Sequence, residues 1–250
     1  MTDTLFHTDA TLTECHATVC AVGPAGIVLD RTVFYPLGGG QAGDSGVLEV
    51  QSGPLAGSSV AITDTRKGKD AEGRATTEIC HVPAPDAAGA AGLQVGDTVV
   101  ARIDGARRHR LMRFHTTTHL LCHLVPAPVN GCSITPDYAR LDFNMTEALD
   151  KDLLTAGIAQ LVAAAHPVVV DAITDAELDA NPALVKSLRV QPPRGSGTVC
   201  TIRIGVGEAI DFQPCGGTHV ANTSEIGVVV VTKIEKKSAT TRRVVLGFAA

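Results

Sequence analysis

Two pairs of potential metal ligands, each with a spacing of four residues, limit what this chain can fold into. His115 and His119 form the first pair, and Cys215 and His219 form the second pair far downstream. On a helix, residues four apart lie on the same face, so both imidazoles of the first pair can point at one position. The Gly-Gly dipeptide inside the second pair lets the backbone bend tightly around a bound group.

Three imidazoles and one thiol are a suitable ligand set for Zn²⁺ in a tetrahedral site. The histidine pair alone is weak evidence, since two histidines four apart occur by chance on solvated or hydrogen-bonded helix faces. Together, however, the two pairs predict a zinc site formed by His115, His119, Cys215 and His219. His123 also follows His119 by four residues, so spacing alone leaves a third histidine on the same face.

The two pairs sit in longer motifs that resemble a known family. His115-Thr-Thr-Thr-His119-Leu-Leu and Cys215-Gly-Gly-Thr-His219-Val are similar to the two zinc motifs of the alanyl-tRNA synthetase editing domain. The free-standing version of that domain is the AlaX family of trans-editing proteins. Alignment with these motifs selects His115 and His119 as ligands and leaves His123 as a packed or exposed neighbour.

The resemblance covers nearly the whole chain, in the order expected for the family. It includes a glycine-rich motif within Phe34–Gly46, the strand Arg140-Leu-Asp-Phe143, the segment Asn222–Gly227, and Arg242-Arg243. Thr117 and Cys122 depart from the family, which often has Ala and His there. With no aminoacylation domain upstream and no coiled coil downstream, the chain resembles the stand-alone type that keeps an N-terminal barrel.

Short apolar runs separated by turn signals predict a small β-barrel in residues 1–104. The strand candidates are residues 15–22, 26–29, 47–50, 60–63, 78–82 and 99–103. Residues 105–250 change character and predict an α+β layer, the zinc-binding editing domain. The expected fold class is therefore α+β: an N-terminal barrel followed by helices packed on a mostly antiparallel sheet.

The second region contains two clear helix patterns. Leu111, Phe114, Leu121 and Val125 recur at helical spacing before Pro126 ends the helix. Thr146 can cap a second helix, whose apolar residues from Leu149 to Val162 form a stripe typical of a core. Thr174 and Glu177 form a capping box that opens a third, short helix. Residues 131–135 with 138–144, and 226–234 with 244–248, predict two hairpins, and residues 198–204 predict a strand.

The glycine-rich motif offers a candidate substrate contact. Gly38, Gly39 and Gly40 present bare backbone close to whatever lies against them, and Gln41 follows at once. The segment lacks the Gly-Lys-Ser/Thr ending of a phosphate loop, and a turn between strands is the simpler reading. The resemblance implies that these residues lie against the zinc site and help to discriminate the amino acid.

Charge and cysteine usage limit the partners and the compartment. A net charge of −5 argues against a general nucleic-acid binder, although local basic clusters remain. Arg107, Arg108, Arg242 and Arg243 are candidates for contacts with tRNA, while solvated charge is the alternative for each. Seven cysteines without a paired framework, no secretory signal and no membrane-spanning run predict a cytoplasmic protein. Monomer and dimer both remain open.

The resemblance implies hydrolysis of the ester between a wrong amino acid and alanine tRNA, with Ser-tRNA first and Gly-tRNA also possible. A site that selects alanine by size rejects glycine and serine poorly, so a second site that tests for the hydroxyl is needed. Zinc can activate a water or polarise the ester carbonyl, and the sequence does not choose between these. No catalytic residue beyond the metal site is assigned.

Three alternatives remain open at this stage: editing of another mischarged tRNA of the threonyl type, a non-catalytic zinc-stabilised tRNA-binding module, and a zinc hydrolase of small esters. The absence of a His-Glu-x-x-His motif argues against the last.

Overall fold

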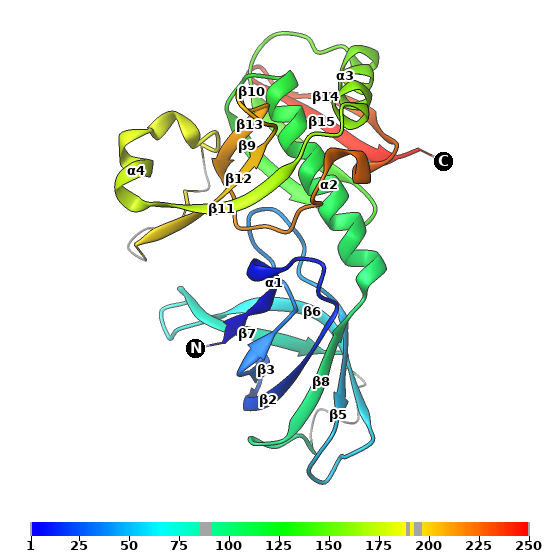
Figure 1. Ribbon diagram of the computed structural model, residues 1–250, viewed down its shortest axis with the longest axis vertical. Coiled ribbons are helices and arrows are strands. Elements are labelled where there is room, and N and C mark those ends of the chain that lie inside the picture. The colour runs from blue at the N-terminus through cyan, green and yellow to red at the C-terminus, as the bar shows by residue number, and fades with distance from the viewer. Residues whose placement is uncertain (1, 86–91, 189–190, 193–196, 250) are drawn as a thin grey trace. The chain divides into compact units, whose positions relative to one another are not determined.

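The computed structural model describes residues 2–85, 92–188, 191–192 and 197–249. The chain forms two compact units (Figure 1). One comprises Met1–Gly38 and Ala42–His109, and the other comprises Gly39–Gln41 and Arg110–Ala250. Among the described helices, none combines the length and hydrophobicity that a membrane span requires.

Six antiparallel strands of the first unit close into a barrel, in the order β2-β3-β7-β6-β5-β8. They are β2 (Glu14–Gly23), β3 (Gly26–Leu29), β5 (Gly46–Val50), β6 (Ser59–Lys69), β7 (Ala75–Pro83) and β8 (Thr98–Ile103). Before and between them lie β1 (Asp3–Thr4), which pairs in parallel with β4 (Arg31–Thr32), and the short helix α1 (Leu5–Thr8). The predicted N-terminal barrel is confirmed.

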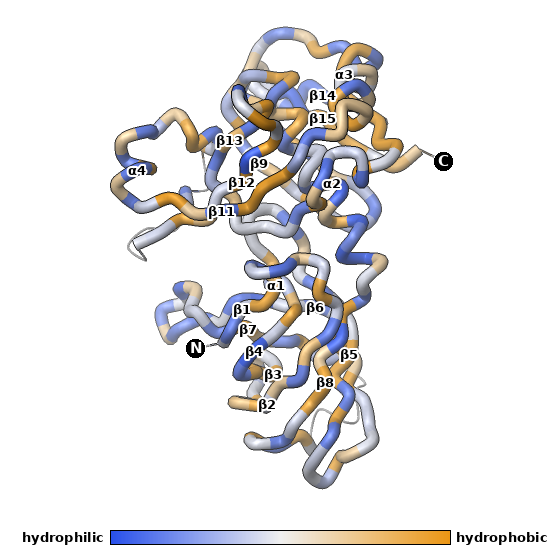
Figure 2. The backbone as a smooth tube through the Cα atoms, viewed as in Figure 1, coloured by the Kyte–Doolittle hydropathy of each residue, from blue (hydrophilic) through white to orange (hydrophobic). Residues whose placement is uncertain are grey.

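The barrel is held by side chains that alternate between its interior and solvent. Along β8, Val99, Ala101 and Ile103 belong to the buried core cluster and Thr98 and Arg102 are exposed, while Val100 is buried outside that cluster. Figure 2 shows the same mixture of hydrophobic and hydrophilic residues along the barrel strands. This period of two is the pattern expected of strands with one buried face, and closure of the sheet leaves no long exposed edge.

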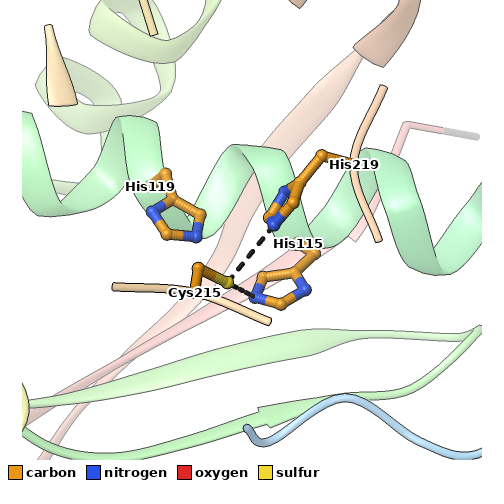
Figure 3. A group of neighbouring side chains, drawn as sticks. All are labelled: His115, His119, Cys215 and His219. Carbon is orange, nitrogen blue, oxygen red and sulfur yellow. Dashed lines mark hydrogen bonds between the residues drawn. The ribbon is translucent and has the colours of Figure 1, made fainter. Parts of the chain in front are cut away.

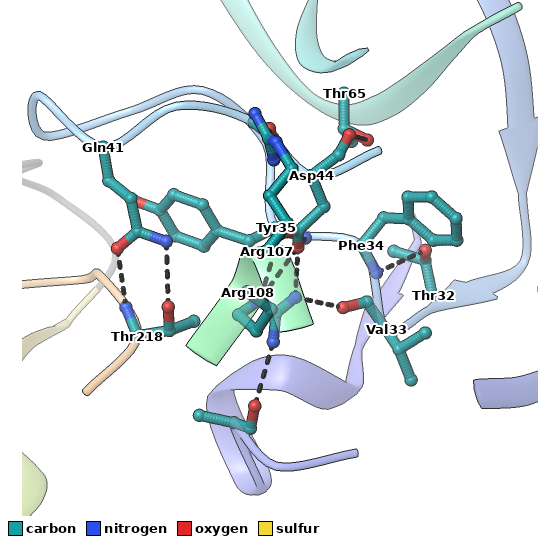
Figure 4. Close-up of polar contacts among 12 residues, drawn as sticks. Thr32, Val33, Phe34, Tyr35, Gln41, Asp44, Thr65, Arg107, Arg108 and Thr218 are labelled. Atoms are coloured by element: carbon teal, nitrogen blue, oxygen red, sulfur yellow. Dashed lines mark hydrogen bonds and ion pairs between the residues drawn. The ribbon is translucent and has the colours of Figure 1, made fainter. Parts of the chain in front are cut away.

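A buried ion pair fixes the polar part of the barrel unit. Arg108 pairs with Asp44, and their side chains are only 2% and 1% exposed (Figure 4). The Arg108 guanidinium also donates to the backbone oxygens of Val33, at 2.6 Å, and Ala10, at 3.0 Å. Asp44 in turn accepts from the backbone N–H of Tyr35 at 2.7 Å. Each partner is therefore hydrogen-bonded on several sides, which offsets the cost of removing both charges from water.

The second unit contains two antiparallel sheets, with strand orders β14-β15-β10-β9 and β11-β12-β13. Their strands are β9 (Val129–Ile134), β10 (Ala139–Asn144), β11 (Val168–Thr174), β12 (Thr198–Ile204), β13 (Asp211–Pro214), β14 (Val229–Ser238) and β15 (Thr241–Phe248). The helices are α2 (Gly105–Leu124), α3 (Lys151–Ala163), α4 (Asp175–Ala180), η2 (Pro182–Leu184) and η3 (Thr223–Ile226). The α+β class and both predicted hairpins are confirmed.

Helix α2 carries the first histidine pair, and the boundary between the two units falls within it, between His109 and Arg110. Its apolar positions Leu111, Phe114 and Leu121 are fully buried, as their spacing predicts. His123, the third histidine of the series, is exposed.

Helix α3 begins later than predicted. Its N-cap is Asp150, whose carboxylate accepts from the backbone N–H groups of Asp152 and Leu153 at 2.8 and 3.0 Å. The predicted cap at Thr146 is therefore wrong, because a carboxylate four residues on satisfies the free N–H groups of the first turn. The apolar stripe is also narrower than predicted, since Leu153 is 72% exposed whereas Ile158 is buried. The capping box of α4, between Thr174 and Glu177, is confirmed.

Two strands of the second unit, β11 and β13, were not predicted. β13 has only four residues and contains Asp211 and Pro214, residue types that are depleted in strands. It exists because it pairs with β12 over Thr201–Ile204. This pairing matters for function, since β13 leads directly to Cys215.

Replacing Arg108 tests whether it is a structural residue. Arg108→Met should lower the free energy of unfolding by about 3–5 kcal/mol, because Asp44 would stay buried without its partner. Arg66→Met, which breaks the exposed pair with Asp64, is the control and should cost less than about 1 kcal/mol. Denaturant unfolding of both variants measures this, and equal losses would contradict the role given to Arg108.

Candidate metal centre

Four side chains of the second unit converge on one point: His115, His119, Cys215 and His219 (Figure 3). One potential ligand atom of each lies within 4.8 Å of the corresponding atoms of the other three. The Cys215 Sγ is 3.4 Å from His115 Nε2 and 3.3 Å from His219 Nε2. All three histidines are buried, while Cys215 is partly exposed.

The local structure explains this convergence. His115 and His119 lie one turn apart on α2, with ring centroids 5.4 Å apart and planes inclined by 26°. Figure 3 shows both rings on the side of the helix that faces Cys215 and His219. The latter two residues occupy the loop that follows β13, where glycines leave room for the approach to α2.

Each imidazole is also held at its other nitrogen, because a protein oxygen lies near every Nδ1. These contacts are His115 with Gln41 Oε1 at 2.7 Å, His119 with Asp211 Oδ2 at 2.7 Å, and His219 with Thr116 Oγ1 at 3.3 Å. A carbonyl or carboxylate oxygen can only accept, so His115 and His119 must donate from Nδ1. Their Nε2 atoms are then left as the nitrogens that can bind a metal once they carry no proton, as in known metal sites.

Asp211 contacts more side chains than the other residues that support the histidines. Besides His119, its buried carboxylate accepts from Gln213 Nε2 at 2.7 Å and pairs with the Lys186 ammonium. Burial would raise the pKa of Asp211, but the hydrogen bond from His119 and the charge of Lys186 lower it to about 2. Burial would likewise lower the pKa of His119, but its contacts with Asp211 and Cys215 raise it to about 9, so a metal that binds His119 must displace a proton from Nε2. The carboxylate therefore stays ionised and keeps His119 oriented.

The thiol of Cys215 differs from its neighbours. Burial would raise its pKa, but its contacts with the imidazoles of His115, His219 and His119 hold it well below the ordinary value. By contrast, burial raises the pKa of Cys122 and of Cys132 to about 12. A thiolate is the form of cysteine that binds a metal, so only Cys215 of these three has the required charge state.

The cluster fits a tetrahedral divalent cation. Its donors are one thiolate and three imidazole nitrogens, a set that suits Zn²⁺ better than hard cations such as Mg²⁺ or Ca²⁺. Burial, together with the neighbouring His115, lowers the pKa of His219 to about 3, so that ring is neutral, as a ligand must be. These residues could therefore hold a metal ion.

Comparison with known proteins agrees with this chemistry. The family model "Threonyl and Alanyl tRNA synthetase second additional domain" matches residues 199–245, and "tRNA synthetases class II (A)" matches residues 6–107. Alanyl-tRNA editing protein AlaX-M of Methanosarcina mazei is 33% identical over 97% of this chain and 95% of its own length. AlaX-M of Saccharolobus solfataricus is 31% identical over 98% of both chains. The chain belongs to the AlaX-M family of alanyl-tRNA editing proteins.

The relationship to the synthetase is also visible. An alanine–tRNA ligase of Saccharolobus islandicus is 29% identical over 94% of this chain, but the match covers only 25% of the ligase. The resemblance to an editing domain, inferred from the motifs, is confirmed by this family membership.

In this AlaX-M family member, three residues of the glycine-rich motif, Gly39–Gln41, belong to the second unit. Gln41 is buried, and both the oxygen and the nitrogen of its side-chain amide form hydrogen bonds (Figure 4). Oε1 accepts from His115 and from the backbone N–H of Thr218 at 3.1 Å, while Nε2 donates to Thr218 Oγ1 at 2.8 Å. Gln41 therefore supports a cluster histidine, a role that its sequence position did not reveal. Gly38 lies in the first unit.

The four arginines predicted to contact tRNA lie in different surroundings. Arg108 and Arg242 are buried, and Arg242 donates to backbone oxygens, including that of Glu147 at 3.0 Å. A phosphate contact does not fit this burial, because their hydrogen-bonding groups are directed into the protein. Arg107 and Arg243 are partly exposed, but Arg107 donates to Gly43 O and Arg243 pairs with Asp142.

The residues that orient the cluster were not predicted from the sequence; they are Thr116, Lys186, Asp211, Gln213 and Thr218. Asp211 and Gln213 precede Cys215 by four and two residues, so proximity to the motif could have marked them. Lys186 is distant in sequence from both motifs and is brought to Asp211 only by the fold.

The glycines next to Cys215 provide a matched test of the geometry. A Cβ on Gly217 would lie 2.1 Å from His115 Cε1, whereas a Cβ on Gly216 would meet no atom within 4 Å. Gly217→Ala should displace His115 and weaken zinc binding by about a hundredfold or more, since even outer contacts typically contribute 10–100-fold. Gly216→Ala should bind zinc like the unmodified protein. Competition with a chromophoric chelator measures both affinities, and equal values for the two variants would contradict the arrangement.

Proposed function

We propose that this chain is a trans-editing hydrolase that removes the wrong amino acid from mischarged alanine tRNA. Serine is the first expected substrate and glycine the second. The observation that carries the proposal is the cluster of three histidines and one cysteine in a chain whose relatives, over nearly its full length, are alanyl-tRNA editing proteins. The enzyme is thus an aminoacyl-tRNA deacylase, which acts on a carboxylic ester.

In this proposal, His115, His119, Cys215 and His219 are the ligands of one Zn²⁺. Bound zinc would supply a Lewis acid that polarises the ester carbonyl or lowers the pKa of a water. The protein contributes the orientation of the ligands: Gln41 and Asp211 keep two imidazoles in the tautomer whose Nε2 is free. Cys215 is the more exposed ligand, so we expect the ester to approach from its side of the cluster.

Gly38, Gly39, Gly40 and Gln41 are proposed to contact the amino-acid moiety. Gln41 supports this placement because it is hydrogen-bonded to His115 itself, and the adjacent glycines carry no side chains that would block the approach. One amide hydrogen of Gln41 remains for a substrate hydroxyl after its bond to Thr218 Oγ1. A change at Gln41 should therefore affect metal binding as well as specificity.

The domain assignment belongs to the same proposal. Residues 1–104 are proposed as a barrel domain with the glycine-rich motif, and residues 105–250 as the zinc-binding deacylase domain, although the compact units place Gly39–Gln41 with the second unit and residues 105–109 with the first. Partly exposed Arg107 and Arg243 remain proposed contacts for tRNA. A cytoplasmic location is proposed because aminoacyl-tRNA is made and used where translation takes place.

Deacylation of a panel of mischarged tRNAs tests the proposal. The purified protein should hydrolyse Ser-tRNA charged on alanine tRNA faster than Ala-tRNA, by on the order of a hundredfold or more, because alanine leaves the groups that bind the hydroxyl unpaired. Release of labelled amino acid over time measures both rates.

Other outcomes would contradict the proposal in distinguishable ways. Equal rates for Ser-tRNA and Ala-tRNA would indicate an unselective zinc esterase. Preference for serine on threonine tRNA would favour the threonyl-type function that the name of the matched domain also includes. Binding of tRNA without turnover would indicate a non-catalytic module.

A further inference from the structure

Two arginines on α2, outside the metal cluster, share one aromatic ring. The guanidinium carbons of Arg110 and Arg113 lie 4.5 and 4.1 Å from the centroid of the Phe248 ring. Each arginine is tethered through Nε to a backbone oxygen, Arg110 to Pro136 at 2.7 Å and Arg113 to Ile226 at 2.6 Å. Ring and tether together fix the position of both guanidinium groups, and the tether uses only the Nε–H of each.

These terminal nitrogens have no partner among the residues that the structure describes, because each arginine donates only through Nε. Neither guanidinium forms an ion pair with a described carboxylate, unlike Arg243 with Asp142. Burial and the adjacent positive charge of Arg110 lower the pKa of Arg113. Two neighbouring cations without a counter-charge repel each other, and a bound anion would relieve this repulsion.

The support behind the pair is rigid. Phe248, near the end of β15, stacks on the fully buried Phe114 of α2, with centroids 4.1 Å apart and an angle of 29°. Gly227, which follows the tether residue Ile226, also lies against Arg113, since a Cβ there would come within 2.9 Å of Arg113 Nη2. Gly227 also has a φ of 66°, which favours glycine. Gly227 is the last residue of the Asn222–Gly227 motif, which supplies no ligand to the metal cluster.

We propose that Arg110 and Arg113 together bind a phosphate group of the tRNA backbone. The proposal rests on the proposed function and names a contact for its substrate. Paired guanidinium groups with free terminal nitrogens match the oxygens of a phosphodiester, and such contacts position a nucleic acid without reading its sequence. The pair also accounts for tRNA binding by a chain with a net charge of −5, since the charge that matters is local.

The position on α2 indicates which part of the tRNA is bound. Arg113 precedes His115 by two residues, which places the two side chains on opposite faces of the helix. The phosphate therefore belongs to a nucleotide away from the esterified ribose, further along the acceptor arm. Loss of the pair should weaken binding of tRNA without altering the chemistry at the ester.

The test compares the unmodified protein with Arg110→Gln, Arg113→Gln and the double variant. Binding of uncharged alanine tRNA is measured over a range of salt concentrations. The double variant should bind about tenfold more weakly or worse, and the slope of log K against log salt should fall by about 1–2, as expected for lost phosphate contacts. On mischarged tRNA, KM should rise while kcat and zinc content stay unchanged.

Matched variants separate this role from a structural one. Arg203 also lies over a ring, that of Phe212, and donates to a backbone oxygen, so Arg203→Gln should leave the salt slope unchanged. Gly227→Ala keeps every charge but displaces Arg113, and it should raise KM. If the double variant is unstable, the single variants and Gly227→Ala give the same information.

Inorganic phosphate at millimolar concentration should compete only weakly with tRNA for the arginine pair. Competition by phosphate as strong as that by unlabelled tRNA would mean a general anion site.

The proposal is overturned if the Gln variants retain the salt slope and the affinity of the unmodified protein, or if they lose kcat with an unchanged KM. These outcomes differ from failure of the proposed function, in which the unmodified protein itself would not deacylate mischarged alanine tRNA.

Discussion

The hydrogen bonds at the Nδ1 atoms of three histidines are the constraint on which the site depends. Without them, each ring could rotate and the four potential ligands would not share one centre. Gln41 fixes His115, Asp211 fixes His119, and Thr116 lies next to the Nδ1 of His219. These supports come from the glycine-rich loop, from β13 and from α2 itself, so the fold of the second unit can be understood as a means of bringing three separate segments to one cluster.

The sequence predicted the convergence of the two motifs but not what holds them. Spacing of four residues and helical periodicity are local properties, so His115, His119 and the boundaries of most barrel strands could be predicted. Lys186, by contrast, lies 25 residues from Asp211 in the sequence and meets it only through the fold, a non-local contact that no short pattern encodes. The cap of α3 was mispredicted for a related reason: Thr146 and Asp150 are both good caps, and the local sequence does not decide between them.

Burial also changes how the arginines of this chain are interpreted. In the sequence, Arg107, Arg108, Arg110 and Arg113 form a single basic run. In the structure, Arg108 neutralises Asp44 inside the barrel unit, whereas Arg110 and Arg113 hold two charges side by side on a ring. An arginine paired with a buried carboxylate contributes to stability, and one that lacks such a partner is available to an anionic ligand. The same residue type in the same run therefore serves two different purposes.

The central claim is that three imidazoles and one thiolate bind a single zinc ion. X-ray absorption at the zinc edge of protein purified without chelator tests it most directly. The account predicts about one zinc per chain, with one sulfur near about 2.3 Å and nitrogen neighbours near about 2.0–2.1 Å. Replacing Cys215 by Ala should remove the sulfur contribution, since Cys215 is the thiol that lies among the three histidines. A zinc shell without sulfur in the unmodified protein, or active protein that contains no metal, would contradict it.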